Sequence, residues 1–397
     1  TGTSNGIVFT GIEDKTQWCF STKAQPSVTV NEIYVDSNGT KDFTTVQGAL
    51  DYIPASNINN YTIHIATGVY EELLFTSNKS NIFLIGEDKV NIIIQYNNYD
   101  SFNNGTGSGT TSDINTGLAA TTPFARGGRS IFLISGGDNI QLENIIFKST
   151  HPQGSAQANQ AETIYFNSTG RLIAKNCSFT GYQDTLQLKG FSWFYNCFIS
   201  GDVDFIWGAN NTALFEKCEI QSRYNSNGGY IVQARSISGF AGFVFLDCLI
   251  TRESDQVKDN SVYLARSYTT SRANTSYNDN VAFINCKIDT HIKSIGYLLP
   301  SVLVVTNPVE SSSVSGWREY GSYNDTGILD LSCRGATNGT IEKYDPVYST
   351  NPTVHGTYIL TQDEAKALYT DRSKILSGTT YNSFSYSGYS GGWNPSL

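Results

Sequence analysis

The chain has 397 residues, a formal net charge of −9 at pH 7 and an isoelectric point near 5.0. This acidic balance argues against a nucleic-acid-binding protein, because binding to phosphates requires a clustered excess of lysine and arginine. The longest apolar run, residues 297–306, is too short to cross a bilayer and is interrupted by Pro300, so we expect no membrane partner either.

Two features predict that the protein is secreted and extracellular. The chain contains no methionine, so we expect that its start is processed and that any targeting peptide has been removed. It also contains ten Asn-x-Ser/Thr sequons, which are typical of secreted glycoproteins. These sequons begin at Asn38, Asn60, Asn78, Asn104, Asn167, Asn176, Asn210, Asn274, Asn324 and Asn338.

The length alone would suggest two or three globular domains, but repeat folds grow in one direction without adding domains. We assign residues 1–28 to an N-terminal extension and residues 29–397 to one repeat domain. Residues 45–53 carry apolar side chains at helical spacing and predict a helix that caps the N-terminal end of this domain. Residues 97–130 are rich in Asn, Gly, Ser and Thr, lack strand alternation and predict a long surface loop.

A short alternating pattern, typical of a β-strand, recurs through the middle of the chain. Its copies are residues 142–147, 174–179, 194–199, 215–220, 245–250 and 283–288. The first three copies with a cysteine are 20 and 21 residues apart, and the later gaps of 30 and 38 residues leave room for loops. The pattern predicts an all-β chain folded as a right-handed parallel β-helix, a single-stranded solenoid in which each repeat forms one turn.

Seven cysteines cannot all pair within one chain. Five of them occur once per repeat and could simply line the interior as buried thiols. These are Cys177, Cys197, Cys218, Cys248 and Cys286. Alternatively, Cys197 and Cys218 lie on consecutive turns and could form a disulfide if their side chains face the same way. Cys19 and Cys333 lie outside the repeats and could join the two terminal regions.

Near the C-terminus, Thr361-Gln-Asp-Glu364 matches a capping box and predicts a helix that runs through Leu368. A coil has two open ends, and unpaired apolar ends favour association. We therefore expect short capping helices at both ends of the solenoid and a monomeric protein.

Two aspartates, Asp184 and Asp204, are 20 residues apart, which is one repeat. If each repeat is one turn, strands stack roughly 4.8 Å apart and the two carboxylates become neighbours on adjacent turns. Like charges that close cannot both ionise easily. One acid would then keep its proton while the other stays anionic, which suits acid/base and nucleophilic chemistry.

Other classes of site have little support in the sequence. None of the four histidines (His64, His151, His291 and His355) follows or precedes a plausible nucleophile, so a Ser-His-Asp triad has no local signal. The cysteines recur at repeat spacing and not as C-x-x-C pairs, so we expect no metal and no cofactor. Polar residues near the two aspartates in sequence or repeat order are Gln160, Gln183 and Arg266.

The blocks around the acids resemble those of pectin methylesterases, the pectinesterases of a carbohydrate esterase family. Residues 181–186, Gly-Tyr-Gln-Asp-Thr-Leu, match one family block, and residues 201–208, Gly-Asp-Val-Asp-Phe-Ile-Trp-Gly, match another with Trp207 in place of phenylalanine. Further similar segments run from residues 35–46 through Gly68-Val-Tyr70 to residues 360–376, with Trp393 and Pro395. The resemblance covers roughly residues 30–397 and implies the parallel β-helix fold.

The resemblance also implies roles for individual residues. Asp204 would attack the C6 carbonyl of a methyl-esterified galacturonate in pectin, and Arg266 would pair with it and orient it. Asp184 would give its proton to departing methanol and then activate the water that opens the acyl-enzyme. Gln160 and Gln183 would donate hydrogen bonds to the tetrahedral oxyanion.

Aromatic side chains near these blocks could stack on the sugar rings. The candidates are Tyr182, Phe205, Trp207, Tyr230 and Tyr268. For Tyr182 and Phe205, a place in the core is an equal alternative. Where the family usually has Y-L-G-R-P-W this chain has Tyr263-Leu-Ala-Arg-Ser-Tyr268, and Gln187 stands where an aromatic residue often occurs. These departures alter the sugar platform more than the reacting centre.

Two other functional classes remain open at this point. The same fold carries pectin-active glycoside hydrolases and lyases, and two acids can cleave a glycosidic bond. Paired glutamines argue against that chemistry, because an oxyanion site suits acyl transfer. A non-catalytic carbohydrate-binding or adhesion protein would explain the repeats and aromatic residues, but it leaves the set of Gln, Asp and Arg residues without a role.

Overall fold

The computed structural model describes the backbone of residues 3–4, 7–8 and 277, and residues 24, 26, 31–103, 128–154, 160–266, 278–298, 311–332, 334, 357–376 and 393–396. The chain divides into two units, Thr1–Val30 and Asn31–Leu397. In the first unit, strand β1 (Thr3–Ser4) pairs antiparallel with β2 (Ile7–Val8).

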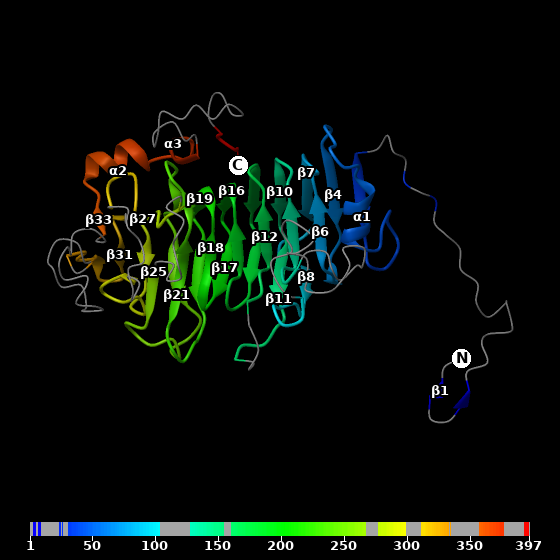
Figure 1. Ribbon diagram of the computed structural model, residues 1–397, viewed down its shortest axis with the longest axis horizontal. Coiled ribbons are helices and arrows are strands. Elements are labelled where there is room, and N and C mark those ends of the chain that lie inside the picture. The colour runs from blue at the N-terminus through cyan, green and yellow to red at the C-terminus, as the bar shows by residue number, and fades with distance from the viewer. Residues whose placement is uncertain are drawn as a thin grey trace. The chain divides into compact units, whose positions relative to one another are not determined.

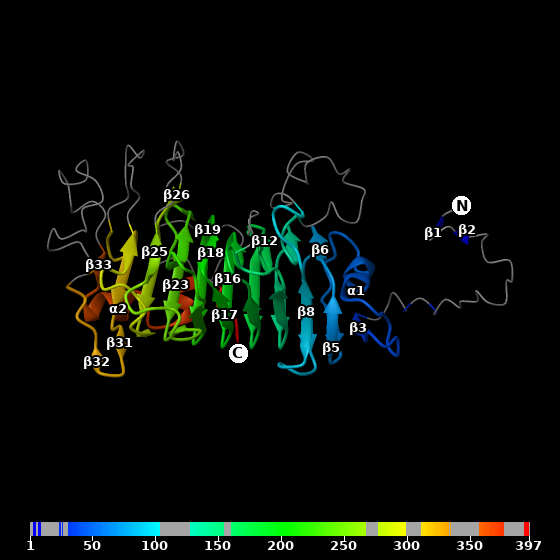
Figure 2. The same ribbon diagram turned by 90° about the horizontal axis from the view of Figure 1, so that it is seen from below.

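In the second unit, the chain winds as a right-handed parallel β-helix (Figure 1), as the sequence predicts. The described strands form three sheets of 11, 10 and 8 members, which we call sheets 1, 2 and 3. Equivalent strands of successive turns lie side by side (Figure 2).

Sheet 1 contains β3 (Glu32–Val35), β4 (Tyr61–Ile65), β7 (Ile82–Gly86), β10 (Ile140–Glu143), β13 (Arg171–Lys175), β16 (Gly190–Tyr195), β19 (Asn210–Glu216), β23 (Gly242–Leu246), β27 (Val281–Ile284), β30 (Trp317–Tyr320) and β33 (Tyr358–Ile359). Sheet 2 contains β5 (Gly68–Glu71), β8 (Ile92–Tyr96), β11 (Ile146–Ser149), β14 (Ser178–Thr180), β17 (Phe198–Gly201), β20 (Glu219–Ser222), β24 (Leu249–Arg252), β28 (Lys287–Ile288), β31 (Tyr323–Asn324) and β32 (Gly327–Ile328). Sheet 3 contains β6 (Leu74–Ser77), β9 (Phe132–Ser135), β12 (Ile164–Asn167), β15 (Leu186–Leu188), β18 (Val203–Gly208), β21 (Gly229–Ala234), β25 (Val262–Arg266) and β29 (Tyr297–Leu298). Outside them, β22 (Ser236–Ile237) pairs antiparallel with β26 (Tyr277–Asn278).

The corner between sheets 1 and 2 explains the recurring sequence pattern. At this corner one residue per turn adopts a left-handed conformation, with φ between 51° and 58°. These residues are Asn144, Asn176, Asn196, Lys217, Asp247 and Asn285. Asparagine tolerates this conformation better than most residues. Neighbouring turns are joined here by side chains as well, since Asn196 Nδ2 donates to Asn176 Oδ1 at 2.7 Å.

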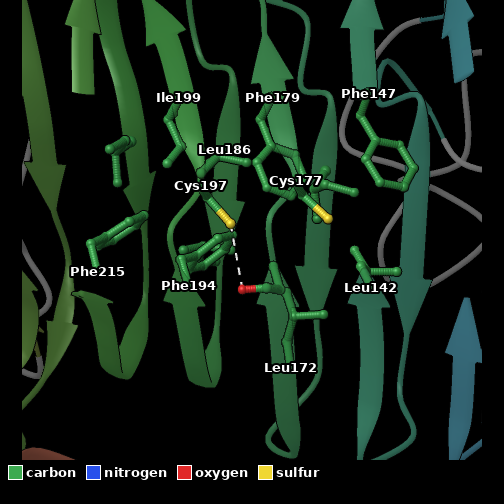
Figure 3. Close-up of a cluster of buried hydrophobic side chains, with 14 of the residues drawn as sticks. Leu142, Phe147, Leu172, Cys177, Phe179, Leu186, Phe194, Cys197, Ile199 and Phe215 are labelled. Carbon is green, nitrogen blue, oxygen red and sulfur yellow. Dashed lines mark hydrogen bonds between the residues drawn. The ribbon is translucent and has the colours of Figure 1, made fainter. Parts of the chain in front are cut away.

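The residue after each left-handed position points into the core, and in five turns it is a cysteine. The structure keeps all five as free thiols, so the predicted disulfide between Cys197 and Cys218 is wrong. Each sulfur instead donates to main-chain carbonyls, as Cys197 does to Ala174 O at 3.4 Å (Figure 3). Burial raises the pKa of Cys177, Cys218, Cys248 and Cys286. Cys19 and Cys333 lie outside the described residues.

A row of stacked aromatic rings also lies in the core, at the same repeat. The rings of Phe194, Phe215, Phe245 and Phe283 follow one another at centroid distances of 4.7, 4.8 and 4.5 Å. Their interplanar angles are 10° or less. Each ring lies on a sheet 1 strand, so the spacing of the strands sets the spacing of the rings.

Both predicted helices form. Helix α1 (Val46–Tyr52) is capped by the side chain of Thr45 and inserts Val46, Ala49 and Leu50 into the core at the N-terminal end of the coil. Helix α2 (Gln362–Leu368) begins with the predicted capping box between Thr361 and Glu364.

The position of α2 differs from the expected end cap. The apolar side of α2, together with α3 (Arg372–Leu376), packs on the outer face of sheet 1 (Figure 1). Ala365 and Ile375 belong there to one cluster with Leu214 and Val244 of that face. The outward residues of these strands are apolar, and a covering layer removes them from water.

The predicted loop over residues 97–130 is described at its two ends, and residues 104–127 lie outside the described part. The ends are fixed by buried asparagines. Asn98 Nδ2 donates to Gly128 O at 2.9 Å and to Ser130 O at 2.8 Å, and Asn103 Nδ2 donates to Asn98 Oδ1 at 2.8 Å. These bonds fix the backbone around Arg129, just before β9.

Candidate active site

Asp184 and Asp204 lie on neighbouring strands of sheet 3, one turn apart. Asp184 lies two residues before β15, and Asp204 lies in β18. Leu186 pairs with Ile206, so the two aspartates occupy equivalent positions on neighbouring turns. The Asp184 N–H donates to Val203 O at 3.0 Å. Both residues have a positive φ, 67° and 48°, and both are buried. Buried non-glycine residues in this conformation are uncommon and often mark functional sites.

The motif around Asp204 contains two glycines at positions where a side chain would not fit. A Cβ on Gly201 would come within 2.6 Å of Tyr182 O on the preceding turn. Gly208 has a φ of 135°, and a Cβ there would lie 2.1 Å from Leu188 O. Gly201, at the end of β17, and Gly208, at the end of β18, therefore let this turn approach the preceding turn closely.

The Asp204 carboxylate accepts hydrogen bonds from two side chains. Arg266 binds it with a two-pronged fork, in which Nε donates to Oδ1 at 2.7 Å and Nη2 donates to Oδ2. Gln233 Nε2 donates to Oδ2 at 3.0 Å. The Gln233 amide is itself oriented by Arg235, which donates to Oε1 at 2.9 and 2.7 Å. A carboxylate held by a guanidinium fork and an amide is fixed in direction as well as in place.

Asp184 lies in a different electrostatic environment. Burial and the neighbouring Glu162 raise its pKa well above the usual range, Arg129 opposes this, and Asp204 raises it further. Arg129 Nη2 donates to Asp184 Oδ2 at 3.0 Å. The pair can therefore hold one proton, with Asp184 as the neutral acid.

Arg129 bridges three carboxylates. Its Nε and Nη2 contact Glu162 at 2.9 and 2.8 Å, and its Nη1 donates to Asp100 Oδ1 at 3.1 Å. Burial lowers the pKa of the Arg129 guanidinium, but Glu162, Asp184 and Asp100 outweigh this effect and raise it. The cation stays charged in spite of its burial.

Five of these residues were not predicted from the sequence: Asp100, Arg129, Glu162, Gln233 and Arg235. Gln233 pairs in register with Trp207 on one side and Arg266 on the other. The sequence hides this position, because Gln233 follows Trp207 by 26 residues, more than the 20 or 21 residues of the preceding repeats. Arg129 lies 55 residues before Asp184, at the end of a long loop, and no local pattern marks it.

The two predicted glutamines lie on consecutive turns beside the acids. Gln183 O accepts from Ala161 N at 3.2 Å, which places the Gln160 and Gln183 segments next to each other. Both side chains are half-buried. Gln183 also lines a cavity of about 300 Å³ together with Tyr182 and Asp202.

The predicted aromatic residues have different surroundings. Phe205 is fully buried in the core, so its prediction as a sugar contact is wrong. Tyr268 lies outside the described residues. Tyr182 lines the 300 Å³ cavity. The Arg223 guanidinium carbon lies 3.8 Å from the centroid of the Tyr182 ring, and Arg223 Nη2 donates to the Tyr182 hydroxyl at 2.8 Å.

Trp207 and Tyr230 both lie beneath arginines of the site. Trp207 is 7% exposed, and the Arg235 guanidinium lies 4.7 Å from its ring centroid. Tyr230 is half-buried, with Arg266 at 4.5 Å from its ring. The two rings thus pack against the arginines around Asp204, which fixes those cations in place.

A larger groove, of about 880 Å³, lies at the other end of the sheet 3 strands and is lined by Asp138, Asn167, Arg171 and Lys189 among others. None of the predicted site residues lines it. Within the described residues, no group of three or more His, Cys, Asp or Glu side chains could hold a metal ion. No described helix is long and apolar enough to span a membrane.

The fold and the site together define a β-helical protein with a carboxylate pair set among arginines and amides. The family model described as Pectinesterase matches residues 32–302. The chain therefore belongs to the pectinesterase family, a family of carboxylic ester hydrolases, and the predicted resemblance is confirmed.

Individual relatives agree with this assignment. Pectinesterase 31 of Arabidopsis thaliana is 31% identical over 243 residues, which are 60% of this chain and 70% of that protein. Probable pectinesterase/pectinesterase inhibitor 64 of the same plant is 27% identical over 82% of this chain, which spans only about half (51%) of that relative's length. The structure is similar to that of a pectin methylesterase from Erwinia chrysanthemi, with a TM-score of 0.63 and 23% identity, over 94% of this chain and 100% of the other.

Proposed function

We propose that this protein hydrolyses the methyl esters of galacturonate units in pectin and releases methanol. The observation that carries the proposal is the asymmetric carboxylate pair one turn apart. One member, Asp204, is held by the fork of Arg266, and the pKa of the other, Asp184, is raised. Membership of the pectinesterase family supports the substrate class.

In the first half of the reaction, an Asp204 oxygen attacks the ester carbonyl carbon. The tetrahedral intermediate collapses as the bond to the methoxy oxygen breaks, and Asp184 transfers its proton to that oxygen, so methanol leaves. In the second half, Asp184 takes a proton from water and the hydroxide attacks the sugar carbonyl of the mixed anhydride. Asp204 leaves as the carboxylate, and Asp184 again holds a proton.

The surrounding side chains assist these steps in different ways. The amides of Gln160 and Gln183 donate to the oxyanion, a contribution worth about 3 to 4 kcal/mol of the barrier for one donor in comparable sites. Arg266 fixes the attacking oxygen, and Gln233 holds the other oxygen of Asp204. Tyr182, Trp207, Tyr230 and Tyr268 are proposed to contact or support the sugar-binding surface.

Pectin is a cell-wall polymer, so the proposal includes secretion. Among the sequons in described residues, Asn38 and Asn60 are exposed and suit glycosylation, whereas Asn210 is fully buried. The disulfide between Cys19 and Cys333 stays a prediction from the sequence. Peptide mapping of the non-reduced protein after deglycosylation checks both features.

One experiment separates this function from its alternatives. Highly methylated pectin is incubated with the protein, and methanol, new reducing ends and unsaturated products are measured in parallel. We expect methanol alone. Reducing ends without methanol would indicate a glycoside hydrolase, unsaturated products a lyase, and no product at all a binding protein.

A further inference from the structure

Asp184 is in contact with a buried ion pair that the proposed chemistry does not use. Glu162 lies just before β12, on the turn preceding Asp184, and its side chain is 0% exposed. Its partner Arg129 has a side chain that is 10% exposed and lies just before β9, a further turn away. The guanidinium reaches past Glu162 to the Asp184 carboxyl group at 3.0 Å.

We propose that Arg129 and Glu162 form a positioning pair for Asp184: Arg129 fixes the acid by a hydrogen bond, and Glu162 offsets the charge of that cation so that Asp184 keeps its proton. The inference rests on the proposed role of Asp184 as the general acid. Neither residue of the pair is proposed to touch substrate.

The hydrogen bond and the charge have opposite effects on the acid. A lone arginine at this distance would stabilise the Asp184 carboxylate and make it a poor proton donor. Glu162 takes two contacts from the same guanidinium, at Nε and Nη2, and its negative charge raises the pKa of Asp184. The pair thus supplies a donor that orients the acid without supplying a net positive charge.

The other charged groups around Asp184 make this compensation necessary. From the following turn, Asp204 raises the pKa of Asp184, but Asp204 is itself paired with Arg266. Arg235, after β21, lowers that pKa. Asp100 contacts Arg129 at 3.1 Å from the loop side. Without Glu162, the charges of Arg129, Arg235 and Arg266 would be balanced only by Asp204, Asp100 and an ionised Asp184. The surroundings would then favour the Asp184 carboxylate over the neutral acid.

The test is the pH profile of methanol release by Glu162→Gln. The variant keeps the shape of the side chain but removes its charge, so only the half-buried Asp100 still offsets the charge of Arg129 beside Asp184. Activity is lost on the alkaline side when Asp184 loses its proton, and we expect this alkaline limb to move to lower pH by about one unit, which is a tenfold change in the proton equilibrium. An unmoved limb in a folded, active variant would overturn the proposal.

The double variant Arg129→Gln/Glu162→Gln removes both charges of the pair, so neither of them is left buried without the other. We expect its alkaline limb to return toward that of the wild type, while kcat falls because Asp184 has lost the donor that orients it. If Glu162→Gln alone does not fold, the double variant still tests whether Arg129 and Glu162 position Asp184. Wild-type kcat in the folded double variant would overturn the positioning role.

A matched control is available at the far end of the coil. Glu319, in β30, is also 0% exposed and pairs with the buried Arg334 at 2.9 Å. Glu319→Gln should lower the melting temperature as any broken buried pair does, but it should not move the alkaline limb. A limb shift of the same size in this variant would show that the effect in Glu162→Gln is a general loss of stability.

A direct titration keeps the inference separate from the proposed function. With 13C-labelled aspartate carboxyls, and Asp184→Asn to assign the signal, NMR measures the Asp184 pKa without substrate. A lower value in Glu162→Gln than in the wild type supports the inference even if methylated pectin is not the substrate. An unchanged value overturns it even if methanol is released.

Discussion

Residues with a positive φ occur at two corners of this coil, and they serve a different purpose at each corner. At the corner between sheets 1 and 2, one residue per turn has a left-handed conformation, and in these residues the side chain is exposed or half-buried. At the start of the sheet 3 strands, Asp184 and Asp204 have the same sign of φ, but their side chains are buried and meet cations. The first corner shapes the turn, and the second aims two carboxylates at one point.

The comparison shows what limits the residue at each position. Asparagine, lysine and aspartate all occur at the first corner, because the requirement there is a tolerated backbone conformation. At the second corner a particular functional group is required as well, since Arg129, Gln233 and Arg266 are arranged to meet a carboxyl group. Substitutions that keep the backbone should therefore have opposite outcomes at the two corners.

The largest effect is expected from replacing aspartate by asparagine at matched left-handed positions. Asp184→Asn removes the proton donor and should lower methanol release by about a thousandfold. Asp247→Asn, at an exposed corner position with a φ of 53°, should leave the rate unchanged. Both variants should melt close to the wild type. Equal effects of the two changes on the rate would remove the distinction between the corners.

A smaller effect is expected from the guanidinium fork. Arg266→Lys keeps the charge but loses the two-pronged contact with Asp204, and kcat should fall by about ten- to a hundredfold. Arg252 makes a similar fork to Asp289, at 2.7 and 3.0 Å, away from the acid pair. Arg252→Lys is the control and should retain full kcat at saturating pectin. A fully active Arg266→Lys would mean that orientation of Asp204 does not depend on the fork.

The smallest effect is expected at the shaping corner. Asn196→Ala puts an alanine at a φ of 51° and should lower the free energy of unfolding by about 1 kcal/mol. Asn196→Gly should cost less, because glycine adopts this conformation freely. Urea unfolding measures both, and methanol release should be that of the wild type. An alanine variant as stable as the glycine variant would show that conformation does not determine the residue here.

The sequence predicted the features that repeat. The spacing of the cysteine strands predicted the β-helix, and the 20-residue separation of Asp184 and Asp204 predicted their position on adjacent turns. It could not predict contacts that depend on loops, such as Arg129 with Asp184, because the loop between residues 97 and 130 brings Arg129 back to the site without a local pattern.

The sequence also did not show to which side of a strand some side chains point. Simple alternation places Phe205 on the same outer side as Trp207, but the bulge between Val203 and Ile206 breaks the alternation and Phe205 lies in the core. Likewise, stacking at one turn brings Cys197 and Cys218 near each other in either state, and only the direction of the sulfurs decides between thiols and a disulfide.

The central claim is that ester hydrolysis depends on the buried Asp204 carboxylate. The most direct test is the initial rate of methanol release from highly methylated pectin by Asp204→Asn, relative to the wild type. Asparagine tolerates the φ of 48° at this position, so the variant should fold with a near-ultraviolet circular dichroism spectrum like that of the wild type. We predict a rate at least about a thousandfold lower. A folded Asp204→Asn variant that releases methanol at a rate near that of the wild type would contradict the account.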